Sequence, residues 1–286
     1  MKTSISSYSF SALYRDGFTI FDAIRKTKEL GLEGFEIAEA GLKTEGDLAD
    51  FLLRVREEAE KNGLPIPCYT VSGNMLTDDP DREVERLCRQ ADMAKLLGAP
   101  VMRHDVAYGL PEWKKGARTF EAVLPRIAEG VRRVTAYASS IGVKTCMENH
   151  GFFAQDSDRV LAIVTAVDHD NYGVLGDMGN FTCADERPDI AFAKVLPNLF
   201  HVHVKDMFLR SGMLPDPGEG WFRSRGGNYI RCTILGHGDV PVPQCLGLLQ
   251  RSGYEGFVSI EFEGMEPPMK AIEICAANLK RYIAAL

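Results

Sequence analysis

Four stretches of the sequence end in side chains that can bind a cation or move a proton, and each follows an apolar run typical of a buried strand. The four residues are Glu148, Asp177, His203 and Glu261. If they converge, three carboxylates without a cation would repel one another and raise one another's pKa. A bound divalent ion removes that repulsion, so the pattern predicts a metal site formed by these four residues.

The ligand types restrict the identity of the metal. Three oxygen ligands and one imidazole suit Mn2+, Mg2+, Co2+ or Fe2+ better than a structural zinc site, which favours Cys and His. We expect one divalent ion, with Mn2+ as the first choice and Mg2+, Co2+, Fe2+ or Zn2+ as the alternatives.

This set of residues is suited to removing a proton from a carbon beside a carbonyl group. The metal would stabilise the charge that develops on oxygen in the resulting enediolate. Glu148 and Glu261 could flank the substrate, so that one takes the proton and the other returns it. Return to the same carbon gives an epimerase and return to the neighbouring carbon an isomerase, whereas loss of a β-hydroxyl group gives a dehydratase.

The segment FHVHVKD, residues 200–206, places three polar side chains on one face of a strand, because alternate side chains point the same way. His203 is the predicted ligand, and His201 is expected deeper on the same face. Lys205 is expected above the metal, where it could bind a substrate oxygen. Three further residues near strand ends are predicted to bind substrate: His104, His150 and Asn180.

Other polar residues are weaker candidates. Glu36 and Glu39 could reach the same site, although Glu39 more simply caps its strand or faces solvent. Arg223, Arg225 and Arg231 could bind a phosphate or carboxylate group. Solvated loop charge is the more frequent explanation for arginines in such a segment.

Eight short β-type runs carry or precede these residues, and amphipathic helical patterns separate them. The predicted strands are 3–9, 34–39, 65–72, 100–106, 143–149, 172–178, 199–205 and 256–262. Eight such units predict a single-domain (β/α)8 TIM barrel over residues 1–286. Active sites of these barrels lie at the carboxyl ends of the strands, where the four candidate ligands would meet.

An open doubly wound sheet is the competing architecture. No G-x-G-x-x-G fingerprint follows the first predicted strand, which argues against it. The connection at about 207–239 is much longer than the usual ~2–6 residues. Its aromatic and aliphatic residues favour an ordered lid between the seventh strand and the seventh helix.

Composition argues against several classes of protein. The formal net charge of -7 argues against a nucleic-acid partner, which needs clustered Lys and Arg. No apolar run approaches the ~20 residues of a membrane span. Seven scattered cysteines without a C-x-x-C pair indicate free thiols in a reducing compartment. Because the N-terminal residues also lack a signal-peptide pattern, we predict a cytoplasmic protein.

Several motifs resemble those of the xylose isomerase-like (β/α)8 superfamily, in its sugar phosphate isomerase/epimerase branch. They are MENHG, GDMGN, HVHVKD, GHGDVP and GYEGFVSIEFEG. The resemblance extends over nearly the whole chain and is strongest from about 143 to 264. It implies that the metal ligands are Glu148, Asp177, His203 and Glu261. It also implies that Glu148 and Glu261 are the acid/base pair. It also makes a homo-oligomer plausible.

One departure separates the chain from the ketose 3-epimerases of this superfamily. Those enzymes carry a His three residues after the aspartate ligand and an Arg six residues after the histidine ligand. Asn180 and Leu209 stand at these two positions, which argues against a 3-epimerase.

The sequence therefore predicts a metal-dependent isomerase or epimerase for a small polyhydroxylated carbonyl compound. The alternative is a lyase or dehydratase that acts on a keto-cyclitol, keto-acid or keto-glycoside through the same site. Two further classes fit less well. An abasic-site endonuclease would need more histidine ligands and a basic face, and a non-catalytic sugar-binding subunit would not need both Glu148 and Glu261.

Overall fold

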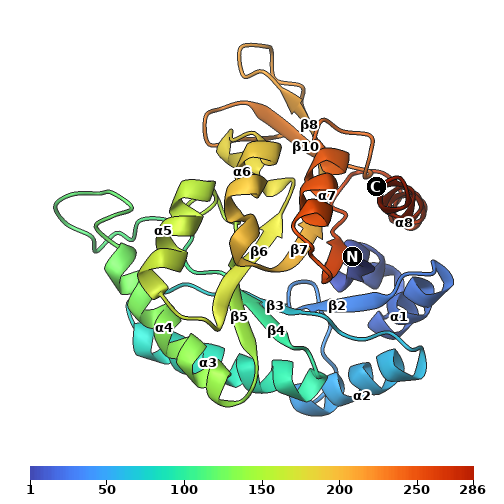
Figure 1. The fold of residues 1–286 in the computed structure, drawn as a ribbon, viewed down its shortest axis with the longest axis horizontal. Helices are drawn as coiled ribbons and strands as arrows, with labels where there is room; N and C mark the ends of the chain where they lie inside the picture. The colour runs from blue at the N-terminus through green and yellow to red at the C-terminus, as the bar shows by residue number, and fades with distance from the viewer.

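The fold is known from a computed structural model, which describes residues 1–286 apart from the side chain of Asp16. In this described part of the chain, eight parallel strands close into a barrel that helices surround (Figure 1). The predicted (β/α)8 architecture is confirmed.

The barrel strands follow one another around the barrel in chain order, and the last pairs with the first. They are Lys2–Ser6 (β1), Gly34–Ala38 (β2), Tyr69–Val71 (β3), Val101–His104 (β4), Lys144–Glu148 (β5), Tyr172–Asp177 (β6), Leu199–Val204 (β7) and Phe257–Ile260 (β11). The helices are Ile20–Glu29 (α1), Leu48–Lys61 (α2), Pro80–Leu97 (α3), Leu124–Ser140 (α4), Ser157–Val167 (α5), Pro188–Val195 (α6), Val242–Arg251 (α7) and Pro268–Ala284 (α8).

Each strand is shorter than its predicted run, and the first shows the reason. Ser6 ends β1 because its side chain accepts a hydrogen bond from the Tyr8 N–H and begins a short 3-10 helix, Ser7–Phe10. Helix α4 begins at Leu124. Its second residue is a proline, which fits a first turn where no N–H is needed.

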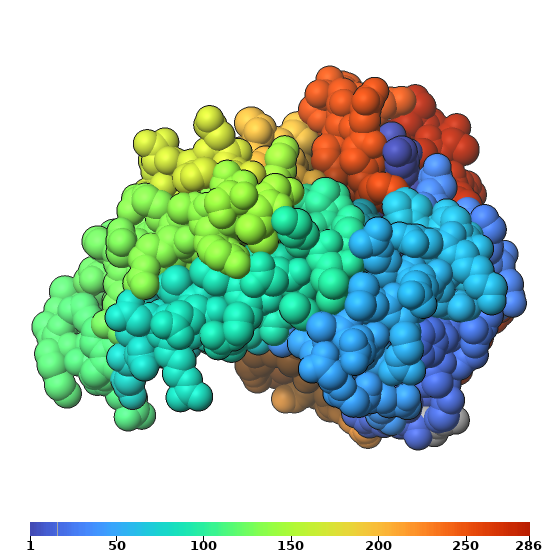
Figure 2. Space-filling model, turned by 90° about the horizontal axis from the view of Figure 1, so that it is seen from below, coloured from blue at the N-terminus to red at the C-terminus, as the bar shows by residue number. Residues whose placement is uncertain are grey.

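The helices bury one apolar stripe each against the outside of the barrel. In α4 the buried residues Ile127, Val131, Val134 and Ala138 recur every three or four positions, as an amphipathic helix requires. Figure 2 shows α2, α3 and α4 as a continuous surface over one side of the molecule. Among the described residues, no helix is both long and apolar enough to cross a membrane.

The barrel interior changes from apolar to polar along the strands. Near the amino ends, a small cluster contains Val101, Cys146 and Leu175. Each of these residues stands two positions before an inward polar residue of the same strand, so both side chains share the inner face. The sequence therefore closes the bottom of the barrel with apolar side chains and leaves polar ones for its carboxyl end.

The predicted lid segment contains regular structure that its sequence did not indicate. Within the described residues it forms a three-stranded antiparallel sheet. The strands are Asp206–Arg210 (β8), Phe222–Arg223 (β9) and Tyr229–Thr233 (β10). In Figure 1 this sheet projects beyond the barrel on the side of α6 and α7. Its strands were missed because their runs are short and Gly and Pro are frequent between them.

The buried carboxylate of Asp206 joins the two ends of this connection. Its Oδ1 accepts hydrogen bonds from the N–H groups of Met207 (2.8 Å) and Val240 (3.1 Å). Its Oδ2 accepts from Gly236 (2.8 Å) and Gly238 (2.9 Å). The GHGDVP motif is therefore a turn wrapped around Asp206.

Replacement of Asp206 by Ala should destabilise the protein strongly. Four N–H groups would lose their acceptor, and the bonds of Met207 and Val240 are buried. Each buried unsatisfied group costs about 1–3 kcal/mol, so we expect the unfolding free energy to fall by at least about 2 kcal/mol. Urea unfolding measures this loss. The control is Asp239→Asn. Asp239 is exposed and, among the described residues, accepts a hydrogen bond from the Leu209 N–H alone. An equal loss of unfolding free energy in both variants would contradict the interpretation.

Candidate active site

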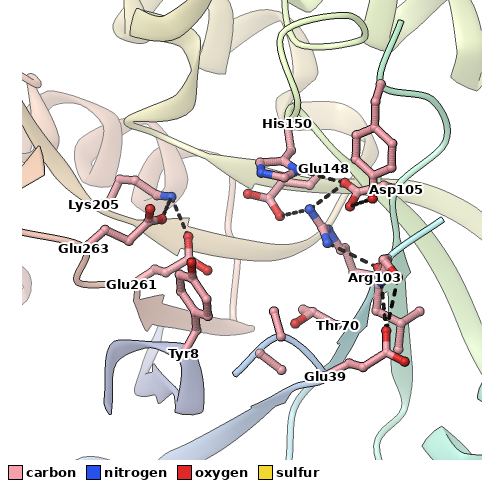
Figure 3. Close-up of a pocket in the computed structure, with 15 residues that line it drawn as sticks. Tyr8, Glu39, Thr70, Arg103, Asp105, Glu148, His150, Lys205, Glu261 and Glu263 are labelled. Carbon is pink, nitrogen blue, oxygen red and sulfur yellow. Dashed lines mark hydrogen bonds and ion pairs between the residues drawn. The ribbon is translucent and has the colours of Figure 1, made fainter. Parts of the chain in front are cut away.

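A cavity of about 300 Å³ opens at the carboxyl ends of the barrel strands (Figure 3). Its walls come from the ends of β1, β2, β3, β4, β5, β7 and β11. Among the residues that line it are Tyr8, Glu39, Thr70, Arg103, Asp105, Glu148, His150, Lys205, Glu261 and Glu263. The position agrees with that of active sites in barrels of this kind.

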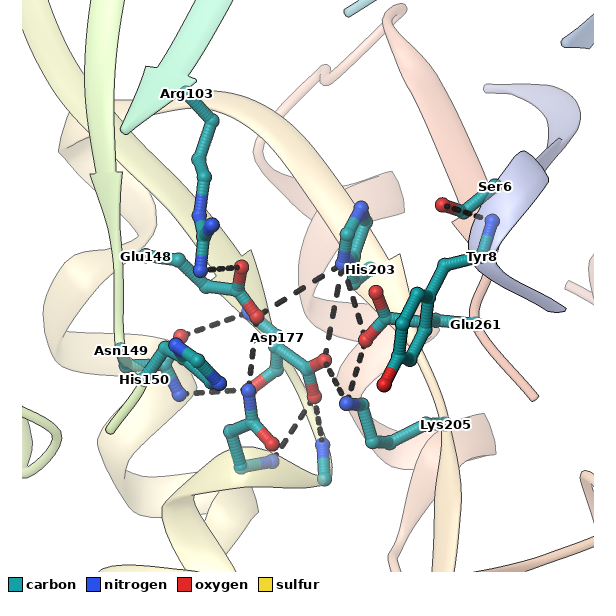
Figure 4. Close-up of polar contacts among 12 residues, drawn as sticks. Ser6, Tyr8, Arg103, Glu148, Asn149, His150, Asp177, His203, Lys205 and Glu261 are labelled. Carbon is teal, nitrogen blue, oxygen red and sulfur yellow. Dashed lines mark hydrogen bonds and ion pairs between the residues drawn. The ribbon is translucent and has the colours of Figure 1, made fainter. Parts of the chain in front are cut away.

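The four predicted ligands meet at the base of this cavity (Figure 4). They come from β5, β6 and β7 and from the residue after β11, which are neighbours in the barrel. The Nδ1 atom of His203 lies 3.8 Å from Glu148 Oε1, 3.9 Å from Asp177 Oδ2 and 3.6 Å from Glu261 Oε2. One ligand atom from each of the four lies within 4.8 Å of all the others.

These four residues fit a divalent ion. Within the described structure, His203 Nδ1 and Asp177 Oδ2 are buried and have no hydrogen-bond partner, which is rare for buried polar atoms. Ligands about 2.1 Å from one ion lie roughly 3–4 Å apart, and His203 Nδ1 lies at such distances from the three carboxylate oxygens. A cation between them would satisfy both atoms and offset the carboxylate repulsion.

Glu36 holds the histidine ligand from the opposite wall of the barrel. It lies in β2, is fully buried, and its Oε1 is 2.8 Å from His203 Nε2. Its Oε2 is 2.6 Å from His201 Nε2. Burial alone would raise the pKa of Glu36, but the two imidazoles outweigh it and lower the pKa to about 2. A carboxylate bonded to one ring nitrogen directs the other nitrogen toward a metal.

One side-chain amide and two backbone N–H groups orient the predicted ligands from β5 and β6. Asn180 donates from Nδ2 to Glu148 Oε1 at 2.8 Å, and Asp177 Oδ1 accepts the N–H groups of Gly179 and Asn180 at 2.8 and 2.9 Å. Asn180 is buried and does not line the cavity. The prediction that Asn180 binds substrate is corrected, because its amide is used to orient Glu148.

A cation accompanies each of the two predicted acid/base residues. Arg103 Nη2 lies 2.7 Å from both Glu148 Oε2 and Asp105 Oδ1. Lys205 Nζ lies 2.5 Å from Glu261 Oε2 and 3.3 Å from Asp177 Oδ2. In Figure 3 these two groups face each other across the cavity. Neither carboxylate is buried without a partner for its charge.

The pKa values of the two lysine-paired carboxylates move in opposite directions. Burial raises the pKa of Asp177 to about 6, although Lys205 opposes the shift. Burial also acts to raise the pKa of Glu261, but Lys205 and His203 outweigh it and hold the pKa well below its usual range. Glu261 is therefore ionised at neutral pH.

The two histidines that were predicted to bind substrate, His150 and His104, lie in different environments. His150 lines the cavity, with Nδ1 3.0 Å from Asp105 Oδ1. His104 is fully buried, its Nδ1 faces the backbone oxygen of Asp105, and its ring lies 6.4 Å from Tyr172. The prediction that His104 binds substrate is corrected, because the alternation of β4 turns Arg103 inward and His104 outward.

Among the described residues, the predicted lid at 207–239 does not contribute to the cavity wall. Its arginines are bonded elsewhere. Arg225 pairs with Asp156 at 2.6 Å, Arg223 donates to Tyr229 Oη at 2.6 Å, and Arg231 lies over two aromatic rings. A role as a lid stays a prediction, since no contact with the cavity supports it.

Sequence reasoning missed several residues of the cavity. Arg103 and Asp105 alternate around His104, and the alternation used for residues 201–205 would have found them. Glu39 was expected to cap or face solvent, but it lines the cavity. Tyr8 lines it from a 3-10 turn, whose side-chain directions no strand pattern predicts.

The chain matches the family described as xylose isomerase-like TIM barrel over residues 24–282 and therefore belongs to it. Its curated relatives include the inosose dehydratase of Bacillus thuringiensis (strain Al Hakam), which is 23% identical over 243 residues, 82% of this chain and 80% of that protein. The inosose dehydratase of Lacticaseibacillus casei is 25% identical over 162 residues, 56% of this chain. That match spans about half, 53%, of the relative's length.

Solved structures share the fold. A probable 3-DHS dehydratase from Bacillus anthracis superposes with a TM-score of 0.75 at 17% identity, over 98% of this chain and 99% of that one. An L-ribulose 3-epimerase gives 0.74 at 15%, over 99% and 95%. A xylose isomerase-like barrel from Mycobacterium smegmatis in complex with magnesium gives 0.72 at 19%, also over 99% and 95%.

Metal binding should stabilise the folded protein. A ligand at about 100 times its Kd adds about 2.7 kcal/mol, so Mn2+ should raise the Tm of chelator-treated protein clearly. Asp177→Asn keeps an oxygen for the N–H groups of Gly179 and Asn180 but removes a charged ligand, and should abolish most of this rise. Differential scanning calorimetry measures the Tm of both proteins with and without Mn2+. If Mn2+ raises the Tm of Asp177→Asn as much as that of the unmodified protein, Asp177 is not a ligand.

Replacement of Glu36 by Gln should weaken metal binding without contact to the metal. Loss of a carboxylate that orients a histidine ligand typically lowers metal affinity about 10–100-fold. Isothermal titration with Mn2+ measures the change, and circular dichroism checks the fold. The matched control is Glu85→Gln, an exposed residue of α3. If both variants bind Mn2+ as the unmodified protein does, Glu36 does not position His203.

Proposed function

We propose that this protein is a divalent-metal-dependent enzyme that removes a proton next to the carbonyl group of a small polyhydroxylated compound and acts as an isomerase or epimerase. One observation carries the proposal. Glu148 and Glu261 come from the two outer strands of the four that supply the ligands, and each is bonded to its own cation.

In the proposed reaction, the residues of the cavity have different roles. A divalent ion at the ligand cluster, which we expect to be Mn2+, supplies positive charge that stabilises negative charge on the substrate oxygen. One of the two glutamates accepts the proton, and the other returns one from the opposite side of the substrate. Lys205 and His150 lie beside these carboxylates and can bond to substrate oxygens.

A lyase is the second candidate, and the curated relatives favour it, since both named above are inosose dehydratases. The first step would be the same proton abstraction. A hydroxyl group on the next carbon would then leave with a proton as water, and Lys205 or His150 could donate that proton. We further expect no nucleic-acid or membrane partner; a homo-oligomer and a cytoplasmic location stay predictions.

The shared first step can be tested without knowledge of the product. The Mn2+-loaded protein is incubated in deuterium oxide with a pool of ketoses, keto acids and inososes, and each compound is followed by mass spectrometry. We expect deuterium at one carbon of one compound. Glu148→Gln and Glu261→Gln should each lower the rate about 10²–10⁴-fold, as expected for loss of a general acid or base.

The control for this experiment is Glu85→Gln, which should keep the rate of the unmodified protein. The labelled product distinguishes an isomer, an epimer and a dehydrated compound. Absence of uptake from a protein that binds Mn2+ would contradict proton abstraction from these compounds. Uptake that survives both glutamate substitutions would remove Glu148 and Glu261 from the mechanism.

A further inference from the structure

The cavity and its base carry an excess of negative charge. Among the described residues, the carboxylates there are Glu39, Asp105, Glu148, Asp177, Glu261 and Glu263. Arg103 and Lys205 are the only permanent cations among the described residues that line it. A divalent ion would still leave two more carboxylates than positive charges, and protonation of His150 would leave one. An anionic group that enters meets net repulsion.

Both cations are already bonded to carboxylates. Arg103 spans Glu148 and Asp105, and only 9% of its side chain is exposed. Lys205 touches Glu261 and Glu263 at 2.5 Å each, and only 4% of its side chain is exposed. A phosphate or carboxylate group could bind either cation only by leaving a buried carboxylate without its partner, which is strongly unfavourable.

The backbone offers no anion site in the glycine-rich turn after β10 either. In (β/α)8 barrels a phosphate site is frequently built from the loops after the seventh and eighth barrel strands. In this chain the N–H groups of Gly236, Gly238 and Val240 all donate to Asp206. The carboxylate of Asp206 occupies the position that an anion would take.

One carboxylate of the cavity keeps an oxygen that suits a hydroxyl group. Glu39 and Asp105 already accept hydrogen bonds within the protein through both of their oxygens. Among the described residues, Glu263 is bonded only through Oε1, to Lys205, so its Oε2 can accept from a substrate hydroxyl. Glu263 is the most open of them, with 33% of its side chain exposed. The hydroxyl group of Tyr8 lies on the same side of the cavity (Figure 3).

We infer that the substrate is uncharged, a ketose or keto-cyclitol without phosphate or carboxylate groups, and that the excess of carboxylates in the cavity, with Glu263 as the accessible one, determines this specificity. The inference rests on the proposed proton abstraction and narrows its substrate. It excludes sugar phosphates and keto acids, which the four-ligand cluster alone would accept.

The test compares matched compounds with the Mn2+-loaded full chain in deuterium oxide. The neutral set contains D-fructose, other ketoses and inososes, and the anionic set contains D-fructose 6-phosphate and keto acids. We expect uptake into a neutral compound at least about tenfold faster than into any anionic one, as net repulsion in the cavity requires. Titration with inorganic phosphate, followed by calorimetry, measures anion binding independently of turnover.

A charge substitution connects the result to the named residues. Glu263→Gln removes one partner of Lys205, so inorganic phosphate should bind at least about fivefold more tightly than to the unmodified protein. The KM for the neutral substrate should rise more than kcat falls, since a hydroxyl acceptor is weakened. The matched control is Glu57→Gln, which removes the same charge from an exposed position of α2. It should change neither the affinity for phosphate nor the KM for the neutral substrate.

The outcomes separate the two proposals. Uptake into neutral compounds alone supports both. Uptake into an anionic compound at an equal or higher rate overturns the inference and leaves proton abstraction in place. If no compound takes up deuterium, the proposal of proton abstraction is contradicted. The phosphate titrations then test the inference that the cavity excludes anions. Tight phosphate binding to the unmodified protein overturns the inference, and phosphate binding gained only in Glu263→Gln supports it.

Discussion

The ionised carboxylate of Glu36 lies at the centre of the barrel, bonded to the imidazoles of His201 and His203. A buried charge is tolerated only where partners compensate it, and the two histidines are these partners. The bond to Nε2 of His203 directs Nδ1 toward the three carboxylates. Because Glu36 and His203 are 167 residues apart in the chain, this contact exists only after the barrel has closed. The geometry of the ligand cluster thus depends on closure of the barrel.

The same requirement for compensation organises the rest of the cavity. Glu148 is bonded to Arg103, and Glu261 to Lys205, so each of the two predicted acid/base residues has a cationic partner in a mostly buried environment. These pairs also determine what can enter. Cations that neutralise carboxylates of the protein do not attract an anionic substrate, whereas an accessible carboxylate such as Glu263 can accept a hydrogen bond from a hydroxyl group. In the proposed mechanism, one set of ion pairs therefore serves both proton transfer and selection of the substrate by charge.

The differences between expectation and structure have particular physical causes. His104 was placed in the site because it ends an apolar run, but the pleat of β4 turns its neighbours Arg103 and Asp105 inward instead. Asn180 stands near the cluster, but its amide is bonded to Glu148 and does not reach the cavity. The long connection after β7 folds into a small sheet whose arginines bond within it and to the α5 side of the barrel. Each error concerns the direction of a side chain or the pairing of a short strand.

The sequence alone determined the number and order of the barrel strands, because each apolar run has the length and the flanking glycines of a buried strand. It also predicted that Glu148, Asp177, His203 and Glu261 would meet, because polar residues at the ends of such runs lie at the carboxyl rim of a barrel. Only the tertiary structure decided the contacts across the barrel: Glu36 with His203, Arg103 with Glu148, Lys205 with Glu261 and Glu263. Those contacts join strands that are distant in sequence, and no local pattern of residues encodes which charge will neutralise which.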